Sequence, residues 1–253
     1  MRFASLGSGS RGNGTVISSD DTHLLLDCGF GYQETVKRLA RLGLEPDMLS
    51  AVVVTHEHSD HWGGVESLAS RHTIPVYATR GTWIEVAGHR LAHTHEVRGA
   101  FEVGSLSITP VTVPHDAREP IQCVFEVSGK RLGVLSDLGS VSAHVLSAFT
   151  ELDALSVEFN HDWTLLHEGP YPSFLKKRVG GDYGHLNNEQ ARDLVAAVAS
   201  ERLQTVVACH VSETNNEVSR VEAALEQALA GHNAERRVAS QSEGMEWITV
   251  GSR

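Results

Sequence analysis

Hydrophobic positions along the chain form short continuous runs that alternate with longer stretches of helical periodicity. Short runs rich in Val, Ile and Leu are typical of buried strands, and apolar residues that recur every three or four positions are typical of helices. The predicted strands cover residues 16–17, 24–26, 51–54, 75–78, 106–109, 121–127, 131–135, 154–159, 205–208 and 247–250. The predicted helices cover residues 33–42, 65–71, 82–87, 142–150, 188–200 and 218–229. Because strands and helices alternate in both halves, we expect sheets in the middle and helices outside.

Several of the apolar strands run directly into a histidine or a carboxylate. The residues that follow these strands are His56 to His61, His115-Asp116, Asp137, Glu158 to Asp162, and His210. Ligand sites in α/β folds gather at the carboxyl ends of strands, and histidines scattered over a surface would not show this placement. Clustered His and Asp residues at strand ends therefore predict a metal site.

The densest of these clusters is the segment His56-Glu57-His58-Ser59-Asp60-His61. His56 and His58 are two residues apart, so in an extended chain both rings project to the same side. Asp60 and His61 follow where the backbone turns, which delivers their side chains to a second position nearby. The pattern HxHxDH is far more specific than a lone HxH, and it favours a metal centre over an ordinary loop.

The composition is that of a globular protein, and its net charge bears on whether the substrate is a nucleic acid. The 253 residues are 41% hydrophobic and 21% charged, which excludes a disordered or collagen-like chain. There are 21 Lys and Arg against 32 Asp and Glu, giving a formal net charge of −11, and there are 15 histidines. This acidity argues against a broadly basic surface for nucleic acid. Bound metal ions would nevertheless make one site cationic inside an acidic protein.

The sequence also predicts a cytoplasmic protein. The N-terminus turns into Gly and Ser after Leu6 without an apolar stretch of signal-peptide length, and no window approaches a membrane helix. The three cysteines, Cys28, Cys123 and Cys209, include no CxxC pair, which disfavours both a disulfide framework and a cysteine zinc site. We therefore expect no membrane partner.

The segment 55–64, Thr-His-Glu-His-Ser-Asp-His-Trp-Gly-Gly, resembles the metal-binding motif of the metallo-β-lactamase superfamily. The similarity continues through Asp27, His115, Asp137 and His210. Within that superfamily, further stretches resemble the YycJ/WalJ (VicX) group, namely 6–15, 158–162, 169–178, 184–188 and 210–216. The group usually shows Ser where Asn187 stands and Leu where Val211 stands, both at positions that are not ligands.

The resemblance implies a fold and a set of ligands. The fold is a four-layer αββα sandwich of two mixed sheets with helices on the outer faces, in a single domain over 1–253 whose halves meet near residue 140. One metal would be held by His56, His58 and His115. A second would be held by Asp60, His61 and His210. Asp137 would bridge both, and this set of imidazoles and carboxylates suits two Zn²⁺ or Mn²⁺ ions.

The resemblance also implies an activity. The superfamily points to a binuclear metal-dependent phosphodiesterase with a metal-bridging hydroxide as nucleophile. The YycJ/WalJ group points to a DNA exonuclease of 5′→3′ polarity in DNA processing or repair, with DNA as the partner. We expect Asp60 and His185 to be catalytic, His185 by protonating the leaving oxygen or binding phosphate. The structural alternative for His185 is a capping loop, with Asn187 or Asn188 as the N-cap.

Other residues around the centre also have two interpretations. Asp27 would accept a hydrogen bond from a metal ligand, or it is a carboxylate in a strand-end turn. Glu158 is expected to support a ligand in the same way, or to line the cleft. The basic run 176–178 would contact backbone phosphates, or it is a solvated helix end. The residues expected to contact substrate are His161, Lys176, Lys177, Arg178 and Asn187.

Two further motifs are predicted to have no functional role. Gly7 to Gly12 matches GxGxxG, but residues 15–18 look like a strand, whereas a dinucleotide site requires a helix at that point. We therefore expect a hairpin loop and no nucleotide cofactor. His93 and His95 form an HxH in what is predicted to be a polar surface loop.

Three alternative functions stay open. A small-molecule hydrolase of the same fold, acting on a cyclic phosphodiester, lactone or thioester, is favoured mildly by the net charge of −11. A di-iron protein that reduces oxygen or nitric oxide is disfavoured, because iron sites of this fold tend to carry a carboxylate where His58 stands. A non-enzymatic scaffolding protein is disfavoured because all the predicted ligands are present.

Overall fold

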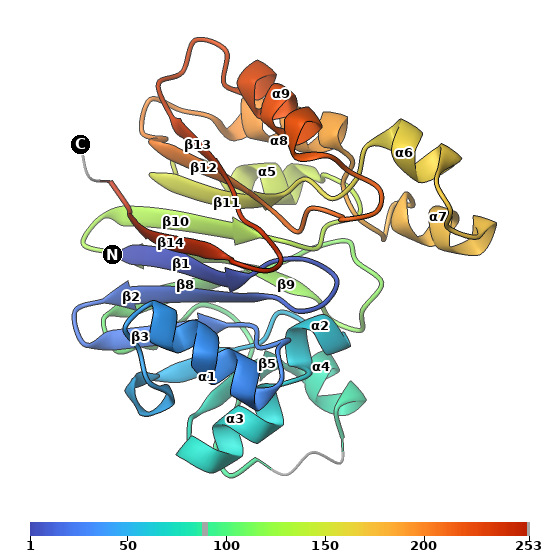
Figure 1. The fold of residues 1–253 in the computed structure, drawn as a ribbon. Helices are drawn as coiled ribbons and strands as arrows, with labels where there is room; N and C mark the ends of the chain where they lie inside the picture. The colour runs from blue at the N-terminus through green and yellow to red at the C-terminus, as the bar shows by residue number, and fades with distance from the viewer. Residues whose placement is uncertain (88–90, 252–253) are drawn as a thin grey trace.

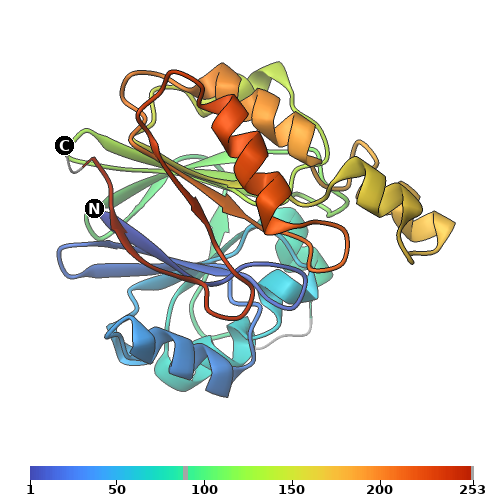
Figure 2. The same cartoon turned by 45° about the horizontal axis from the view of Figure 1, so that its top comes forward.

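Two mixed β-sheets packed face to face form the centre of the protein, and helices cover their outer faces (Figure 1). The computed structural model describes residues 1–87 and 91–251. Each sheet has seven strands, ordered β14-β1-β2-β3-β4-β5-β6 in the first and β13-β12-β11-β10-β9-β8-β7 in the second. Viewed from a second angle, the helices again lie on the two outer sides (Figure 2). The predicted four-layer αββα sandwich is thus confirmed.

The first sheet takes its strands from the two ends of the chain. They are β1 (Arg2–Gly7), β2 (Gly14–Ser19), β3 (Thr22–Leu26), β4 (Ala51–Val53), β5 (Val76–Thr79), β6 (Thr94–Val97) and β14 (Met245–Thr249). Its helices are α1 (Tyr32–Arg41), the 3₁₀ helix η1 (Pro46–Met48), α2 (Ser59–Trp62), α3 (Val65–His72) and α4 (Arg80–Glu85).

The second sheet is built from the middle of the chain. Its strands are β7 (Phe101–Val103), β8 (Leu106–Thr112), β9 (Ile121–Val127), β10 (Lys130–Leu135), β11 (Ala154–Glu158), β12 (Thr205–Cys209) and β13 (Glu235–Val238). Its helices are α5 (Ala143–Ala148), α6 (Trp163–Glu168), α7 (Ser173–Val179), α8 (Asn188–Val198) and α9 (Val218–Ala228). Within residues 1–87 and 91–251, every helix is too short or too polar to span a membrane.

The directions of the strands bring chemically important loops to one edge of the sandwich. In the first sheet β3, β4, β5 and β6 are parallel. In the second sheet β10, β11, β12 and β13 are parallel, and β8 has the same direction because β8 and β10 both pair antiparallel with β9. The loops that follow these strands therefore emerge at common edges, which is where α/β folds place their ligand sites.

The chain passes from one sheet to the other between Val97 and Phe101 and returns with β14. The exchange between sheets thus does not coincide with the boundary near residue 140 that we expected between two halves. The single domain over 1–253 stays a prediction, and its residues 88–90 and 252–253 lie outside the described residues.

Apolar side chains fill three layers. A cluster between the sheets contains Phe3, Ile17 and Phe125, which are at most 1% exposed. A second cluster joins the second sheet to α5, α8 and α9, and a third joins the first sheet to α1 and α3. Burial of this apolar surface is the main force that holds the four layers together.

All the predicted strands and helices are present, with ends shifted by a few residues. The predicted hairpin between β9 and β10 is confirmed, and Ser128 and Gly129 both have positive φ, +51° and +73°, as a type I′ turn requires. The patterns missed β1, although its residues 3–7 are buried, and β6, where residues 94–96 are exposed. They also missed β13 and the short helices α2, α6 and α7. His95 lies in β6 and stacks on Tyr77, so its predicted place in a loop is wrong, although it is exposed as expected.

A truncation of the central core should destabilise the fold. Phe125→Ala removes a ring that is 0% exposed between the sheets. We expect a loss of about 3–5 kcal/mol in the free energy of unfolding, measured by urea denaturation. The control is Phe174→Ala, since Phe174 is 73% exposed, and it should change stability by less than about 0.5 kcal/mol. Equal effects of the two substitutions would contradict the assignment of this core.

Candidate metal centre

Loops that follow strands of both sheets meet at one edge of the sandwich. The loop after β4 supplies His56 and leads into α2, which carries Asp60 and His61. The loops after β8, β10 and β12 supply His115, Asp137 and His210. The imidazoles of His56, His61, His115 and His210 and the carboxylate of Asp137 are all buried. Residues that are far apart in sequence, in loops of both sheets, therefore contribute their side chains to one cluster.

Three imidazoles form the first part of the cluster. One ring nitrogen from each of His56, His58 and His115 lies within 4.8 Å of the others. His56 Nε2 is 3.1 Å from His58 Nδ1, and the ring centroids of His56 and His115 are 4.8 Å apart. His58 is partly exposed, so this group is open to solvent on one side.

The second part of the cluster surrounds the Asp137 carboxylate. Asp137 Oδ2 is 3.1 Å from His61 Nε2, and Asp137 Oδ1 is 3.2 Å from His210 Nδ1. Asp60 Oδ2 completes this part at 3.4 Å from His61 Nε2 and 3.9 Å from His210 Nε2. Asp137 Oδ1 is also 3.7 Å from His115 Nε2. Asp137 thus lies between the two groups of ligand atoms.

The charges in the cluster oppose the effect of burial. Burial alone would raise the pKa of Asp137, but the neighbouring His210 and His61 hold it well below its usual range. Burial would likewise lower the pKa of His61, but Asp137 and Asp27 raise it well above the usual value. The same competition raises the pKa of His210 to about 9. At His56 burial and the neighbouring His61 outweigh the attraction of Asp137, so the pKa of this imidazole lies well below the usual value.

The donor atoms fit a divalent metal. In the described part of the chain, His115 Nε2 and Asp137 Oδ2 are buried and make no hydrogen bond, although His61 Nε2 lies 3.1 Å from Asp137 Oδ2. A buried polar atom without a partner costs free energy, and coordination to a cation removes that cost. Imidazole and carboxylate donors without a thiolate are the types that Zn²⁺ and Mn²⁺ accept.

Hydrogen bonds behind the cluster fix the orientation of its rings. Asp27 Oδ2 is 2.8 Å from His61 Nδ1, and Asp27 Oδ1 accepts a hydrogen bond from the Thr55 backbone N–H at 2.8 Å. His115 Nδ1 lies 3.0 Å from the carbonyl oxygen of Gly184. Both rings therefore direct Nε2 into the cluster, because Nδ1 is engaged on the other side.

Two of these residues have an unusual backbone conformation. Asp27 and His210 have positive φ values of +62° and +50°, in the left-handed region that residues other than glycine rarely adopt. Strained backbone of this kind persists only where the surroundings hold it in place. Here the Asp27 carboxylate is held by Thr55 and His61, and the backbone N–H of His210 donates to Ser8 Oγ at 2.8 Å.

Asn13 supports the cluster and was not assigned a role from the sequence. Its Nδ2 donates to Asp60 Oδ2 at 3.1 Å, and its backbone N–H donates to the Asp60 carbonyl at 2.7 Å. Its Oδ1 accepts from the Gly9 N–H at 2.8 Å. The GxGxxG segment is the β1–β2 hairpin loop that we expected, and it folds against α2. A Gly- and Ser-rich loop that ends in Asn was the available signal.

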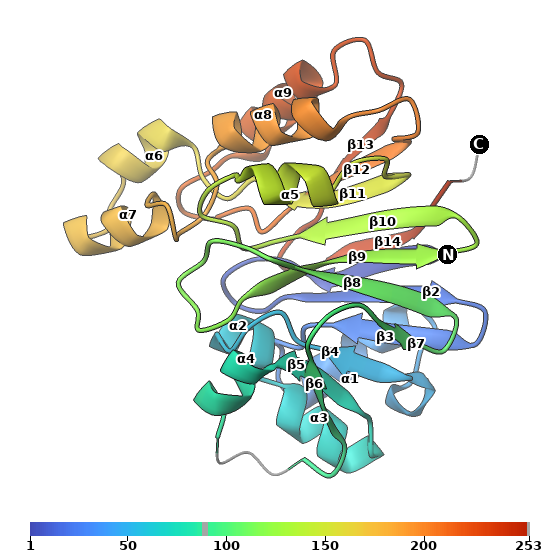
Figure 3. The same cartoon turned by 180° about the vertical axis from the view of Figure 1, so that it is seen from behind.

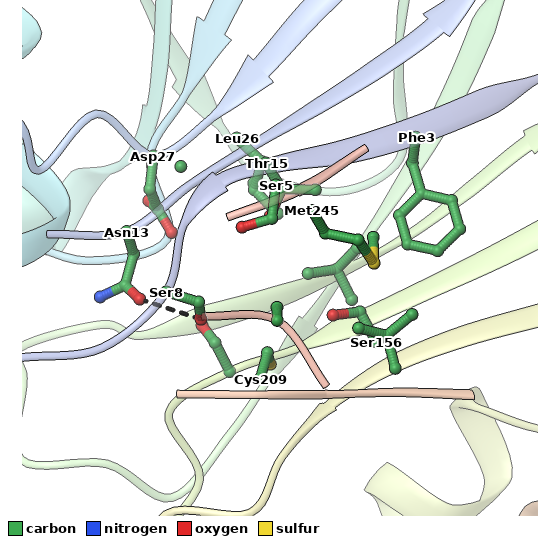
Figure 4. Close-up of a pocket in the computed structure, with 15 residues that line it drawn as sticks. Phe3, Ser5, Ser8, Asn13, Thr15, Leu26, Asp27, Ser156, Cys209 and Met245 are labelled. Carbon is green, nitrogen blue, oxygen red and sulfur yellow. Dashed lines mark hydrogen bonds between the residues drawn. The ribbon is translucent and has the colours of Figure 1, made fainter. Parts of the chain in front are cut away.

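A small cavity lined by both polar and apolar residues lies beside this support, between the two sheets. Figure 4 shows Asn13, Asp27 and Ser8 together on one side of it, with Ser8 hydrogen bonded to Asn13, and Ser156 on the other side. Its volume of 10 Å³ is about that of one water molecule. The cavity is too small for a substrate, so it belongs to the support of the centre.

The substrate-sized opening is a different cleft of 350 Å³. Its walls include His58, Asp60, Asp137, His185 and His210, so it opens directly on the cluster. A molecule bound in this cleft would contact the ligand side chains from the solvent side.

His185 and Glu158 form a pair at the wall of this cleft. His185 Nδ1 is 3.0 Å from Glu158 Oε2, while Glu158 Oε1 accepts from the backbone N–H groups of Leu138 and Leu186 at 2.8 and 3.0 Å. Burial raises the pKa of Glu158 well above its usual range and lowers that of His185 to about 4. One nitrogen of His185 also lies within 4.8 Å of Asp137 and His210 ligand atoms, which makes His185 a further candidate ligand.

The residues predicted to bind substrate are distributed over different environments. Arg178 lines the cleft, whereas Lys176 and Lys177 line a separate groove on the other side of α7. His161 is only 1% exposed and does not line the cleft. Asn187 caps α8, where its Oδ1 accepts from the Gln190 N–H at 2.8 Å, so the predicted N-cap is confirmed, while the role of His185 in this loop stays a prediction.

Asp116 was also given no role from the sequence, although it was recognised as one of the polar residues that follow an apolar strand. Its Oδ1 is 3.6 Å from His58 Nε2 and 3.5 Å from His115 Nε2, and its Oδ2 accepts from Arg178 Nε at 2.5 Å. Asp116 thus connects the first imidazole group to α7. Its position next to His115 can be seen in the sequence, but its pairing with Arg178 depends on the packing of a distant helix.

A methyl group at Gly29 should displace the backbone of α2. A Cβ there would lie 1.8 Å from the Asp60 carbonyl oxygen. We expect Gly29→Ala to lower stability by about 3 kcal/mol, measured by urea denaturation, and to weaken the binding of divalent metal, measured by calorimetry. The control is Gly31→Ala, because a Cβ at Gly31 meets no atom within 4 Å. Metal affinity that is the same in both variants would contradict the role of this contact.

Comparisons with known proteins agree with this geometry. Residues 22–210 match the family model described as "Beta-lactamase superfamily domain". The chain is 32% identical over 223 residues to "Exodeoxyribonuclease YycJ" of Bacillus anthracis, which covers 85% of this chain and 84% of the relative. It is 30% identical over 224 residues to "Exodeoxyribonuclease WalJ" of Streptococcus pneumoniae, with coverage of 85% and 83%.

The fold is similar to that of a solved metalloprotein, Zn²⁺-bound PqqB from Methylobacterium extorquens. The TM-score is 0.74 over 99% of this chain and 100% of that chain, at 19% sequence identity. At this identity the likeness concerns the fold alone. The matched family model and the two relatives show the family: the chain belongs to the metallo-β-lactamase superfamily, in the family that includes YycJ and WalJ.

Proposed function

We propose that the protein is a binuclear metal-dependent phosphodiesterase that degrades DNA as an exonuclease of 5′→3′ polarity. The observation that carries the proposal is the Asp137 carboxylate, which lies between two groups of ligand atoms at the floor of an open cleft. The names of the two relatives, both called exodeoxyribonucleases, support DNA as the substrate.

The proposed ligand set divides the cluster into two metal positions. His56, His58 and His115 would hold one ion, and Asp60, His61 and His210 would hold the other. Asp137 would contact both, which its position between the groups supports. Zn²⁺ and Mn²⁺ are the proposed ions, because the donors are imidazoles and carboxylates.

When bound, a pair of divalent ions would lower the pKa of water and stabilise the negative charge that develops on the oxygens around the attacked phosphorus. The protein's own residues supply the remaining functions. Asp27 keeps the His61 ring oriented through its 2.8 Å contact, and Asn13 does the same for the Asp60 carboxylate. Asp60 borders the cleft, and its carboxylate is proposed to accept a proton from the attacking water.

His185 is proposed to give a proton to the leaving oxygen from Nε2, while Glu158, whose raised pKa keeps it protonated, gives its own proton to Nδ1. Its ring lines the cleft, and its Nδ1 is held by Glu158 at 3.0 Å, so Nε2 is the nitrogen available to substrate. Glu158 is in turn held by two backbone N–H groups, which fixes the pair relative to Asp137. Positioning of a proton donor in this way contributes about 10²–10⁴-fold to the rate of such reactions.

A small-molecule phosphodiesterase is the second candidate. The cleft volume of 350 Å³ would hold a compact substrate, and the net charge of −11 disfavours a large contact with DNA. This candidate shares the ligands and the proton donor with the first. The two differ in whether surfaces outside the cleft contribute to substrate affinity.

The first test measures metal content and DNA cleavage together. Protein loaded with Zn²⁺ or Mn²⁺ should bind about two equivalents and shorten 5′-phosphorylated oligonucleotides from the 5′ end, and EDTA should abolish the activity. His58→Ala should lower metal content and reduce cleavage by more than about 100-fold, because even groups that only support a ligand contribute about 10–100-fold. His144→Ala is the control, since His144 is exposed on α5.

Failure to cleave DNA with Zn²⁺, Mn²⁺ or Mg²⁺ would exclude the exonuclease. Hydrolysis of bis-p-nitrophenyl phosphate by the same preparation would then favour the small-molecule candidate.

The second test examines the leaving group. His185→Ala should reduce DNA cleavage by about 10²–10⁴-fold but affect a p-nitrophenyl ester much less, because p-nitrophenolate leaves without a proton. Metal content, measured by mass spectrometry, should be unchanged. Loss of one metal equivalent together with equal losses on both substrates would instead make His185 a ligand beside Asp137 and His210.

A further inference from the structure

A second opening lies next to the cleft, on the pair of helices that projects from the sandwich. Helices α6 and α7 extend from the edge where α2 also lies, away from both sheets (Figures 1 and 3). A groove of 580 Å³ runs between them. Trp163, Leu166 and His167 of α6 form one wall, and Lys176 and Lys177 of α7 contribute to the other. We call residues 163–183 the α6–α7 arm.

Helix α7 separates this groove from the catalytic cleft. Leu175, Arg178 and Val179 line the cleft, while Ser173, Lys176, Lys177 and Gly180 line the groove. Each set has the spacing of residues three or four apart, which lie on one face of a helix. The two openings are therefore one helix width apart, and a chain-like ligand can extend from one to the other across α7.

The arm carries an unusual concentration of exposed aromatic rings. Trp163, Phe174 and Tyr183 are 53%, 73% and 65% exposed, and the other large exposed hydrophobics in the described ranges are aliphatic. The Trp163 ring is nearly parallel to that of His167, with an interplanar angle of 12°. Exposed apolar rings are costly to hydrate, and a concentration of them marks a binding surface.

The charge of the arm is opposite to that of the whole protein. The chain has a net charge of −11 and only four lysines, two of which are Lys176 and Lys177. Lys176 Nζ donates to the carbonyl oxygen of His167 at 2.7 Å, which fixes this cation beside the aromatic wall, and Lys177 is exposed. Glu168 and Asp182 limit the positive region to a narrow strip. Such a strip suits one phosphate backbone better than the wide surface of a duplex.

We propose that the α6–α7 arm binds single-stranded nucleic acid, whose bases stack on Trp163 and Phe174 while Lys177 contacts the backbone. This inference rests on the proposed function, because it assigns the substrate strand a path from the groove to the cleft. A single strand exposes the faces of its bases, whereas a duplex hides them between neighbouring pairs. Exposed aromatic rings beside cations are the features that bind single strands irrespective of sequence.

The test removes the rings and the bases separately. Fluorescence anisotropy would measure the affinity of the metal-loaded protein for a cleavage-resistant phosphorothioate oligo(dT) of about twelve nucleotides, and for an abasic strand of equal length. Trp163→Ala and Phe174→Ala should each weaken binding of oligo(dT) by about tenfold. Both should change binding of the abasic strand by less than about twofold, because that strand has no bases to stack. Val218→Ala, at an exposed apolar residue of α9, is the control.

The charge is tested by a pair of lysine variants. Lys177→Ala should weaken binding of both strands equally and reduce the slope of log affinity against log salt by about 0.7, the value for one phosphate contact on a single strand. Lys37→Ala, at an exposed lysine of α1, should leave both affinities and the slope unchanged.

The outcomes distinguish this inference from the proposed function. If the wild-type protein cleaves DNA but the Trp163→Ala and Phe174→Ala variants bind oligo(dT) as tightly as the wild type, the binding role of the arm is wrong and the exonuclease proposal stands. Base-dependent binding without cleavage would support the arm and overturn the exonuclease. Wild-type protein that binds neither strand would overturn the arm. So would a dimer that the two aromatic substitutions dissociate without a change in DNA affinity, since the rings would then bind a second copy of the chain.

Discussion

The charge of the buried Asp137 carboxylate is the constraint on which the rest of the site depends. A carboxylate that is 2% exposed needs positive partners, because its desolvation is otherwise too costly. His61 from the first sheet and His210 from the second lie 3.1 and 3.2 Å from its oxygens. Asp137 follows β10, and its partners come from both sheets. The metal centre therefore forms only when the two sheets pack against each other in the correct relative position.

Packing of the layers and assembly of the centre are therefore the same event. The β1–β2 loop reaches α2 through Asn13, and Gly29 lets the chain pass against the Asp60 carbonyl. The backbone N–H of His210 donates a hydrogen bond to Ser8, which follows β1 of the opposite sheet. The contacts that hold the two sheets together therefore also set the positions of the metal ligands. A change in the spacing of the two sheets would move ligands from different sheets relative to one another.

Much of this was predictable because strand ends are a local property of the sequence. Each of His56, His115, Asp137 and His210 follows an apolar run, and parallel strands bring such ends to one edge. The support by Asn13 and the pairing of Asp116 with Arg178 were not predictable, because they join segments whose approach is decided by loop and helix packing. Edge strand β6 and the short helices of the arm were missed because exposed segments lack a strong apolar period.

The left-handed backbone of Asp27 and His210 has a consequence for the evolution of the protein. Strained backbone costs about 1–3 kcal/mol at each such residue, so the centre is maintained against the conformational preference of its own chain. Glycine would relax both positions and yet remove a side chain that the centre uses. Selection for thermal robustness alone would therefore tend to erode the site.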